Sequence, residues 1–588
     1  MARSDFISPD GLYPLAFDNP STSTGATEYL DSPSIRLLVD FFHAKGLILL
    51  KKEDHAEDWY QDWIDYQARH GLYATLLSPQ QYSTRGTRFD LRNYTRFLEA
   101  FAYFSPAHAY SLHVSFLGLF PILISANEPL KREAVARLEA GGLFAFAVSE
   151  KDHGSDLLAI EFTLRSAEST GLYARGSKYY IGNANAAGLV SVLGKQIGPD
   201  GNGPTRRSPF VFFALRPQNN STFANVRKIR TLGIRTAFVA EFEVNDHPVP
   251  VEDVFSQGRE AWDTAFGTVD FGKFFLGFGS VGICERAFAE AFRHLRTRIL
   301  YGKPVTDMPH IRLALAGAFA RLTGMKLYAG RALDYFQAAG PDDRRYLLFN
   351  AVQKARVSTE GVKVMGLLSE SIGAKGFEAE SFFETALREA PMIPGLEGST
   401  HINFALTAQF IDHYFADSAD GPPPPESVTL RQADPEENPY WMGPRDRHPK
   451  TVRFGPCLTA YKALRAVPNV RTFVRQVQVF RDLFAGDGAP DIAADAGLTI
   501  AVGKCFSAVV YGQLVAENCA AAAVPAGMAS VIFHGLIEDL TIEAVRLATL
   551  FPSGSAHRAQ LKRIVRVPRT NVADVAAVFD FLQPRFAA

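Results

Sequence analysis

Pro391-Met-Ile-Pro-Gly-Leu-Glu-Gly-Ser-Thr-His-Ile-Asn403 is the stretch from which the rest of the chain is best interpreted. Its one carboxylate, Glu397, lies between a leucine and a glycine and follows an apolar arm with two prolines. Ser399 and Thr400 are residue types that cap helix N-termini, so we expect a loop that enters a helix over residues 401–414. Alone, this pattern favours an ordinary solvated Glu before a capped helix. The alternative is a catalytic base on a turn that glycine permits.

The composition is that of a globular protein without a charge bias. Of the 588 residues, 47% are hydrophobic and 21% are charged, which is enough apolar material for several cores. Lys and Arg number 61 against 62 Asp and Glu, so no global charge indicates nucleic acid or an acidic membrane as a partner. At roughly 100–200 residues per domain, the length allows about three to five domains.

The cysteines and the apolar runs indicate an intracellular protein. The four cysteines form no CxxC pair and have no nearby His cluster, so we expect no metal site, no disulfide framework and a cytoplasmic location. The N-terminus lacks the apolar core of a secretory signal. Apolar runs at 110–126 and 514–536 are interrupted by His, Pro or Glu, so we interpret both as buried helices rather than transmembrane segments.

The hydrophobic period changes along the chain and predicts an α+β protein that is mostly α. Residues 1–145 predict an N-terminal helical domain, whereas short β-type runs separated by turn residues fill 146–259 and predict a small antiparallel β-domain. Long helices with one apolar stripe return at 260–418 and predict a four-helix bundle. A Pro-rich and acidic linker spans 419–452, and 453–588 predicts an added helical domain.

Four further motifs are weak evidence when each is taken alone. The loop at 147–156 can offer backbone N–H groups to a ligand, but an ordinary polar turn has the same composition. The segment 177–183 fits a strand with two aromatic residues. In 298–304, Arg298 is either a phosphate partner or a solvated residue at a helix end. The glycine pair in 373–377 is weak evidence for any structure.

The order and spacing of these motifs around the Glu397 stretch resemble the acyl-CoA dehydrogenase family, over about half of the chain. Ser149-Glu150 with Gly154-Ser155-Asp156 matches the family's first signature, and Leu232-Gly-Ile-Arg235 with 242–250 matches the exit from its β-domain. Arg298-Ile-Leu-Tyr-Gly302 is similar to its Arg-x-x-Phe-Gly turn. Gly373-Ala-Lys-Gly-Phe377 matches its glycine turn, and Glu397-Gly-Ser399 matches its Glu-Gly-Thr motif. The C-terminal block is similar to the extra helical domain of the longer branches of this family.

The resemblance implies a fold and a reaction. The fold is an N-terminal helical domain, a middle antiparallel β-barrel and a C-terminal four-helix bundle, with FAD as cofactor. The reaction is α,β-dehydrogenation of an acyl thioester carried on CoA or on an acyl-carrier protein. The implied electron acceptor is an electron-transferring flavoprotein, and the implied assembly is a homodimer.

The resemblance also assigns residues to the site. Glu397 would abstract the α-proton, and the flavin would take the β-hydride. The cofactor-binding set is Val148, Ser149, Tyr180, Gly182, Arg298, Tyr301, Gly373, Ser399 and His401. The substrate-binding set is Ser155, Asp270, Lys273 and Gly398. The apolar helix that carries Leu112, Phe116 and Phe120 either lines the acyl pocket or is plain core.

The sequence departs from the family's pattern mainly on the flavin side. Tyr180 and Gly182 stand where the family has Trp and Thr, and Pro309, Glu370 and His401 stand where it has Gln. Two alternatives therefore stay open. One is a flavin-dependent oxidase or monooxygenase on the same fold, and the other is a non-catalytic or DNA-associated protein with an altered flavin site.

The C-terminal block carries a modest basic excess. From Lys450 onward there are 15 Lys and Arg against 10 Asp and Glu, and much of the excess lies at 557–569. A solvated amphipathic face is the simpler interpretation. Contact with an acidic membrane surface, a carrier protein or nucleic acid is the alternative, although the sequence gives no strong nucleic-acid signal.

Overall fold

The computed structural model describes residues 32–166, 171–199, 203–217, 222–416, 421–427, 437–443, 452–485 and 488–585. The chain forms two compact units, each of which is described by itself. The sheet unit consists of Ala44–Phe275 and Pro435–Arg447. The bundle unit consists of Met1–His43, Leu276–Asp434 and His448–Ala588. The four boundaries between the five segments expected from the sequence stay predictions, and much of the expected linker lies outside the described residues.

Helices precede the sheet along the chain, and local sequence explains where several of them begin. Asp90, Ser105 and Asn127 each accept a hydrogen bond from a backbone N–H of the following first turn, so they cap α5, α6 and α7. Helix α6 is buried along nearly its whole length, as expected for the apolar run there. The helices are α2 (Pro33–Ala56), α3 (Gln61–His70), α4 (Leu72–Leu77), α5 (Leu91–Phe104), α6 (Pro106–Leu123) and α7 (Glu128–Glu139).

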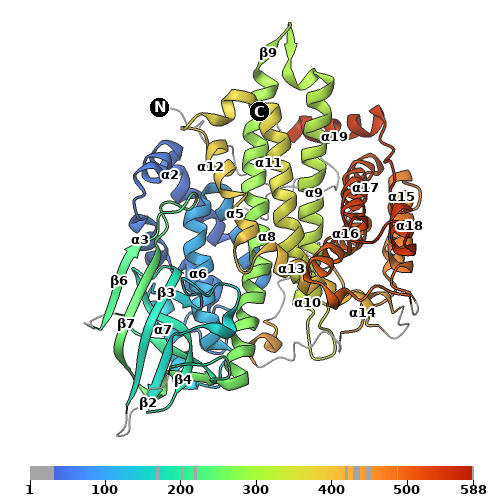
Figure 1. The fold of residues 1–588 in the computed structure, drawn as a ribbon. Coiled ribbons are helices and arrows are strands. Elements are labelled where there is room, and N and C mark those ends of the chain that lie inside the picture. Colours follow the sequence, from blue (N-terminus) through green and yellow to red (C-terminus); the bar gives the residue numbers. More distant parts are fainter. Residues whose placement is uncertain are drawn as a thin grey trace. The chain divides into compact units, whose positions relative to one another are not determined.

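An eight-stranded sheet follows, in the order β6-β7-β3-β2-β4-β5-β8, with β1 paired to β4. Figure 1 shows β2, β3, β4, β6 and β7 drawn together in teal and green. Alternate residues of these strands, among them Val192, Phe213 and Phe242, form one apolar core together with Phe162, which directly precedes β2. The strands are β1 (Leu143–Ala147), β2 (Thr163–Ser166), β3 (Leu172–Gly182), β4 (Ala187–Ile197), β5 (Phe210–Leu215), β6 (Phe223–Lys228), β7 (Val239–Val249) and β8 (Val254–Gln257).

The sheet is mixed, whereas the sequence predicted antiparallel pairing throughout. Strands β1 and β2 both pair parallel to β4, along successive stretches of one edge. Alternating apolar residues specify which face of a strand is buried but not the direction of its neighbour, which explains the error. The predicted fold class, mostly α with a β-domain in the middle, is confirmed.

Long helices form the bundle unit. Helix α8 begins at Gly258 in the sheet unit, and its part from Leu276 onward lies in the bundle unit. Figure 1 shows α8, α9 and α11 running alongside one another, with a two-stranded hairpin between the end of α8 and the start of α9. The elements are α8 (Gly258–Thr297), β9 (Ile299–Leu300), β10 (Lys303–Pro304), α9 (Pro309–Gln337), α10 (Tyr346–Val352), α11 (Ser358–Ile372), α12 (Phe382–Glu389), α13 (Thr400–Ala408) and α14 (Ile411–Phe415).

The apolar period predicts one continuous helix over 344–371, but a π-helical turn, Gln353–Val357, interrupts it. The side chains of Gln353, Lys354 and Arg356 are all buried on this one turn. A π-turn adds a residue to the helix and so changes which side chains point inward, and such turns are frequent at functional sites. The apolar period on either side does not reveal it.

The C-terminal block is helical, as predicted, and it belongs to the bundle unit. Helix α16 is long and apolar enough to cross a membrane by length and composition, but 67% of its most apolar window is buried inside the protein, as in the core helix of a globular protein. No group of three or more metal-ligating side chains occurs among the described residues. The helices are α15 (Pro468–Asp482), α16 (Ala496–Ala521), α17 (Ala526–Ala548), α18 (Ala556–Lys562) and α19 (Val572–Arg585).

A buried ionic cluster joins α17 to α9 and α11. Asp539 of α17 contacts Arg321 (3.0 Å), Lys363 (2.8 Å) and Arg356. Glu360 binds Arg321 (2.6 Å) and Arg356 (3.2 Å). Burial opposes ionisation, but the neighbouring cations hold the pKa of Asp539 far below its ordinary value. This cluster fixes the C-terminal block to the bundle.

Candidate active site

Glu397 lies on the predicted loop before a capped helix. Its backbone is left-handed, with φ of 51°, and the next residue, Gly398, has φ of 84°. A non-glycine residue rarely adopts this conformation, and such strain clusters at functional sites. Ser399 accepts a hydrogen bond from the N–H of Ile402 (3.5 Å) and caps α13, as expected. The Glu397 side chain is half-buried.

Two buried polar side chains hold this loop, and neither was predicted. Lys354 donates from Nζ to the carbonyl oxygen of Pro394 (2.8 Å). Asn403 donates from Nδ2 to the carbonyl oxygens of Gly398 (3.0 Å) and Ser399 (3.0 Å). Lys354 precedes Pro394 by 40 residues and reaches it from the π-turn through tertiary packing, so no local sequence pattern relates the two.

The other predicted residues of the bundle unit lie mostly at the surface. Arg298 follows α8, and its carbonyl oxygen accepts a hydrogen bond from the N–H of Val305 (3.0 Å) across the hairpin. Tyr301 lies at the hairpin tip with φ of 52° and is 95% exposed. Gly373 has φ of 63° and open space where a side chain would be, so its backbone is accessible. His401 is exposed in the first turn of α13.

In the sheet unit, the predicted flavin-side residues come from two segments that hydrogen-bond to each other. Ser149 donates from Oγ to the carbonyl oxygen of Tyr179 (2.7 Å), and the N–H of Tyr179 donates to the carbonyl oxygen of Ser149 (3.0 Å). Val148 is buried. Tyr180 follows with a left-handed backbone, φ of 64°, and a 60% exposed side chain. The two segments are therefore held together, with an aromatic ring open to solvent.

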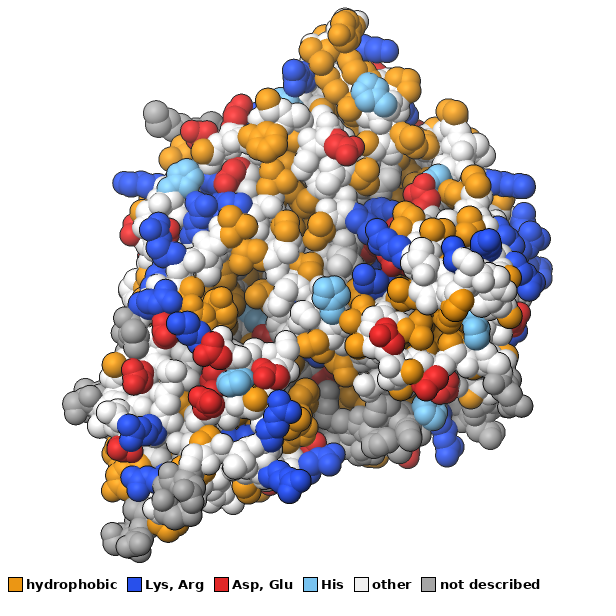
Figure 2. All heavy atoms as spheres, viewed as in Figure 1, with side chains coloured by type: hydrophobic (Ala, Val, Ile, Leu, Met, Phe, Trp, Pro, Cys, Tyr) orange, Lys and Arg blue, Asp and Glu red, His pale blue; other side chains and the backbone are white. Residues whose placement is uncertain are grey.

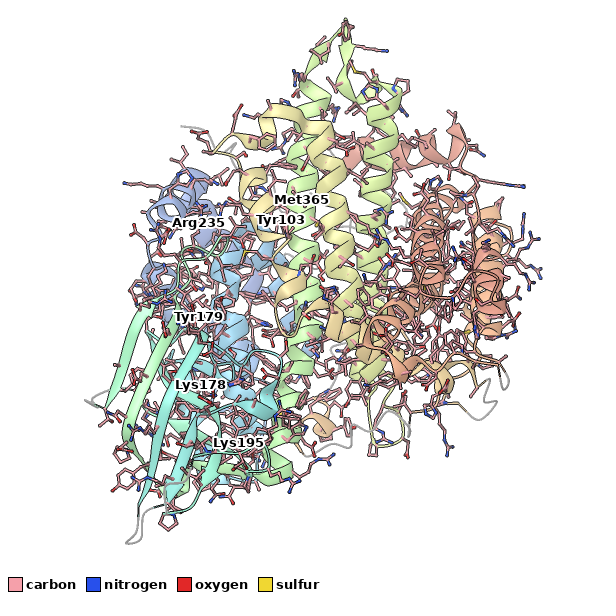
Figure 3. The ribbon with its side chains drawn as sticks, viewed as in Figure 1. Tyr103, Lys178, Tyr179, Lys195, Arg235 and Met365 are labelled. Carbon is pink, nitrogen blue, oxygen red and sulfur yellow. The ribbon has the colours of Figure 1, made fainter. Side chains whose placement is uncertain are left out.

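Glu150 of the first motif has a structural role that the sequence did not reveal. Its carboxylate accepts from Lys178 Nζ (2.8 Å) and from the N–H groups of Glu161 (2.7 Å) and Phe162 (3.1 Å). Lys178 also donates to the carbonyl oxygen of Val148 (2.9 Å). Figure 3 shows Lys178 and Tyr179 next to each other on β3. Burial lowers the pKa of Lys178 to about 8, against the opposing effect of Glu150.

Gly182 is required by a close approach. A Cβ atom built there would lie 2.7 Å from the ring and the hydroxyl of Tyr110 and 2.8 Å from Val114, both on α6. The space that the Thr side chain of the acyl-CoA dehydrogenase pattern would need is therefore filled by a tyrosine from another element. Tyr110 was not among the predicted site residues, because nothing in the local sequence relates it to Gly182.

The predicted substrate residues of the sheet unit differ in exposure. Ser155 is exposed on the loop after β1, two residues after His153, whose Nδ1 lies 3.1 Å from Asp156. This hydrogen bond raises the pKa of His153. Asp270 and Lys273 lie one turn apart on α8 and are both buried.

The aromatic residues of α6 form part of a packed cluster. Phe116 contacts Phe89 (ring centroids 5.8 Å apart), Phe271 (5.6 Å) and Phe275 (5.0 Å). Leu112, Phe116 and Phe120 are each at most 2% exposed, which is the core environment that was one of the two expectations. Trp441, from the segment after the linker, packs edge-on against Phe271 at 5.1 Å.

A surface cavity of about 570 Å³ is lined by residues of β2, β3, β4 and β7 and of the loop after β4. It is lined by charges of both signs, among them Arg165, Arg175 and Asp246. Both arginines lie 3.8 Å from Asp246, so the charges largely compensate one another. The cavity lies in the sheet unit, and its lining includes none of the residues predicted to bind cofactor or substrate.

The basic residues of the C-terminal block are exposed. Arg563, Arg566 and Arg569 lie at the surface after α18, and Figure 2 shows Lys and Arg side chains gathered over α15 and α18. Val567, which is 83% exposed, lies among them. This distribution agrees with a solvated amphipathic face.

The predicted residues thus form two groups, one on each unit, and each group by itself offers features that suit a part of FAD. The sheet unit offers the exposed ring of Tyr180 and the Val148–Ser149 backbone, and the bundle unit offers the Arg298 guanidinium and the open backbone of Gly373. An aromatic face suits a planar ring system, and a guanidinium suits a phosphate.

Comparisons with known proteins support the resemblance that the motifs predicted. Residues 260–411 match the family described as acyl-CoA dehydrogenase, C-terminal domain. The cyclohex-1-ene-1-carbonyl-CoA dehydrogenase of Syntrophus aciditrophicus is 24% identical over 358 residues, which cover 60% of this chain and 81% of that protein.

Two solved structures share the fold. An acyl-CoA dehydrogenase from Bacillus anthracis, complexed with FAD, aligns with a TM-score of 0.73 and 17% identity over 99% of this chain and 98% of that chain. The C-terminal helices are therefore part of the shared fold. The prolyl acyl carrier protein oxidase AnaB aligns with a TM-score of 0.54 and 20% identity over 65% of this chain and 99% of its own.

Proposed function

The chain carries the acyl-CoA dehydrogenase C-terminal domain on the fold of that family, and from this premise we propose that it is an FAD-dependent oxidoreductase that dehydrogenates an acyl thioester between its α and β carbons. The observation that carries the proposal is the geometry of Glu397. This carboxylate lies on a strained, left-handed turn before a capped helix, within the matched domain. Strain of this kind persists where a side chain must be held in one direction.

Glu397 acts as the base. Its carboxylate takes the proton from the α-carbon as that C–H bond breaks and the carbon–carbon double bond forms. FAD, when bound, supplies the acceptor for the hydride that leaves the β-carbon. The half-buried position of Glu397 limits its contact with water, which suits a base that must remove a weakly acidic proton.

We propose the following residues for binding. Tyr180, Val148 and Ser149 contact the flavin ring from the sheet unit. Arg298, Tyr301, Gly373, Ser399 and His401 contact the dinucleotide from the bundle unit. Ser155, Asp270, Lys273 and Gly398 orient the thioester and its pantetheine arm. Gly182 contributes backbone only, because Tyr110 fills the space of its side chain.

The test is an anaerobic visible spectrum of the purified protein with a panel of acyl thioesters. We expect a flavin band that bleaches with at least one of them. The Glu397→Gln variant should keep the flavin band, and its rate of bleaching should fall at least about 10³-fold, because the amide cannot accept the proton. Glu380→Gln, which changes an exposed carboxylate just before α12 in the same matched domain, is the control and should bleach normally. Normal bleaching of Glu397→Gln would contradict the assignment.

A flavin oxidase on the same fold is the second candidate, and the structural similarity to the acyl carrier protein oxidase AnaB favours it. The two candidates share the proposed base and differ in what reoxidises the reduced flavin. Rapid reoxidation in air with stoichiometric peroxide indicates the oxidase. Slow reoxidation in air, with fast reoxidation by an electron-transferring flavoprotein, indicates the dehydrogenase.

We also propose a homodimer that works in the cytoplasm. The similarity to the acyl-CoA dehydrogenase family supports the dimer, and four buried cysteines that form no disulfide agree with a reducing compartment. Light scattering of the FAD-loaded protein tests the assembly. The mass of a single chain, 64.6 kDa, would contradict it.

A further inference from the structure

Lys354 is a buried cation that binds the loop of the proposed base. Its side chain is fully buried on the π-helical turn, and its Nζ lies 2.8 Å from the carbonyl oxygen of Pro394. Burying an ammonium group is costly unless its hydrogen bonds are made inside the protein. A methionine of similar length would fill the same space without that cost, so packing alone does not require a lysine at this position.

The backbone around Glu397 is held on both sides. Before it, the carbonyl oxygen of Pro394 accepts from Lys354 and from Oγ1 of Thr400 (2.8 Å). After it, Asn403 binds the carbonyl oxygens of the next two residues. A non-glycine residue stays in the left-handed region only when its surroundings over-determine it. These hydrogen bonds supply that constraint.

The turn that carries Lys354 is itself anchored. Arg356, on the same π-turn, is buried and bound to Glu360 (3.2 Å) and to Asp539 of α17. A side chain can hold a loop in place only when the backbone that carries this side chain is itself fixed. The C-terminal helices thus fix the turn, and the turn fixes the loop.

We propose that Lys354 is a positioning residue for Glu397, and that the C-terminal block supports it through Asp539 and Arg356. This inference rests on the proposed function. Proton transfer requires the carboxylate within hydrogen-bond reach of the α-carbon proton, and a misplacement of about 1 Å costs roughly 10²-fold in rate. Loss of the Lys354 hydrogen bond therefore slows proton abstraction more than it weakens thioester binding, to which only Gly398 of this loop contributes.

The experiment compares Lys354→Met with the parent in two measurements. The first is stopped-flow reduction of bound FAD by an acyl-CoA, with and without deuterium at the α-carbon. We expect the reduction rate to fall roughly 10- to 100-fold, the substrate Kd to change much less than the rate, and the isotope effect to increase. An isotope effect reports the proton-abstraction step, so a general loss of folded enzyme does not change it.

The second measurement is amide hydrogen exchange of the loop peptide that contains Glu397, which does not depend on activity. Exchange there should be faster in Lys354→Met. Lys326→Met is the matched control, because it removes a mostly buried lysine of the same unit from an ion pair with Glu285 of α8. It should leave both measurements unchanged. If Lys354→Met does not fold, Asn403→Ala removes the other support and should give the same two effects.

Unchanged exchange and an unchanged isotope effect in a folded Lys354→Met protein would overturn the inference. Failure of the proposed function looks different. In that case no acyl thioester reduces the flavin of the parent, while exchange of the loop still distinguishes Lys354→Met from its control. Faster exchange in the variant then supports the positioning role, and equal exchange refutes it.

Discussion

At the scale of single residues, Gly182 is the clearest case in which one element excludes a side chain on another. A Cβ atom there would lie within 2.8 Å of Tyr110 and Val114. We expect Gly182→Ala to lower the free energy of unfolding by about 1–3 kcal/mol, as for other overpacked sites. Thermal unfolding measures this loss. Tyr110→Ala in the same chain should restore part of it.

Gly366→Ala is the matched control for Gly182. Gly366 lies on α11, and a Cβ atom added to it would have no other atom within 4 Å, so an alanine there meets open space. We expect it to be neutral or to stabilise the helix by up to about 1 kcal/mol. Equal losses for the two variants would mean that the Tyr110 contact does not determine the glycine.

The same scale separates what the sequence can predict about the site from what it cannot. Glu397 and Ser399, which caps α13, lie in one contiguous motif, and the helix begins where the capping pattern predicted. Lys354 and Asn403 hold the loop that carries Glu397, and Lys178 holds the segment that carries Glu150. Each of these residues reaches its partner through tertiary packing or a strand register. Their local patterns are those of ordinary helix and strand residues.

At the scale of elements, the joint between α17 and the bundle depends on one carboxylate. Asp539 binds three cations, and its removal leaves the buried Arg356 and the mostly buried Arg321 with one carboxylate partner fewer. We expect Asp539→Asn to lower the free energy of unfolding by about 3–5 kcal/mol, which is typical of breaking a buried ion pair. Asp482→Asn, on the exposed part of α15, is the control and should change stability by less than about 0.5 kcal/mol. A loss as small as the control's would contradict the role of the joint.

The same carboxylate predicts a pH dependence. Its pKa is well below the ordinary value in the folded protein, so the unfolded chain binds a proton at Asp539 at a higher pH than the folded chain does. The stability that it contributes is therefore complete above about pH 4 and is lost as the pH falls below that value. Denaturant titrations between pH 6 and pH 3 should show a shallower acid loss for Asp539→Asn than for the parent. Identical slopes would refute the assignment.

Helices and strands can be predicted where the hydrophobic period extends over many residues. They are missed where tertiary contacts determine the local conformation. The apolar stripe from Pro309 predicts a helix that ends at 338, and the helix ends at Gln337, because the stripe is continuous. Strands β6 and β8 are missed because their sequences, Phe-Ala-Asn-Val-Arg-Lys and Val-Phe-Ser-Gln, do not alternate apolar and polar residues. The π-turn is equally invisible there, because one additional residue leaves the flanking pattern unchanged.

At the scale of the whole molecule, the segment 437–443 belongs to the sheet unit although the chain on either side of 435–447 belongs to the bundle unit. Composition predicts only a linker there, because a Pro-rich and acidic stretch has no hydrophobic period that would indicate a helix or strand and the core against which it packs. Glu437 accepts hydrogen bonds from the N–H groups of Gln80 (2.8 Å) and Phe89 (3.0 Å). The segment is therefore an integral part of a unit that is distant in sequence.

Trp441 is the anchor of that segment, since its side chain is 1% exposed and packs against Phe271. We expect Trp441→Ala to lower the free energy of unfolding of the sheet unit by about 3–5 kcal/mol, through lost burial and the cavity left behind. Hydrogen exchange of β-strand peptides measures that unit specifically. Tyr301→Ala, which truncates a 95% exposed aromatic ring, is the control and should leave exchange of the strands unchanged. Strand exchange that stays at the parent's rate in Trp441→Ala would mean that the segment only rests on the sheet unit and does not stabilise it.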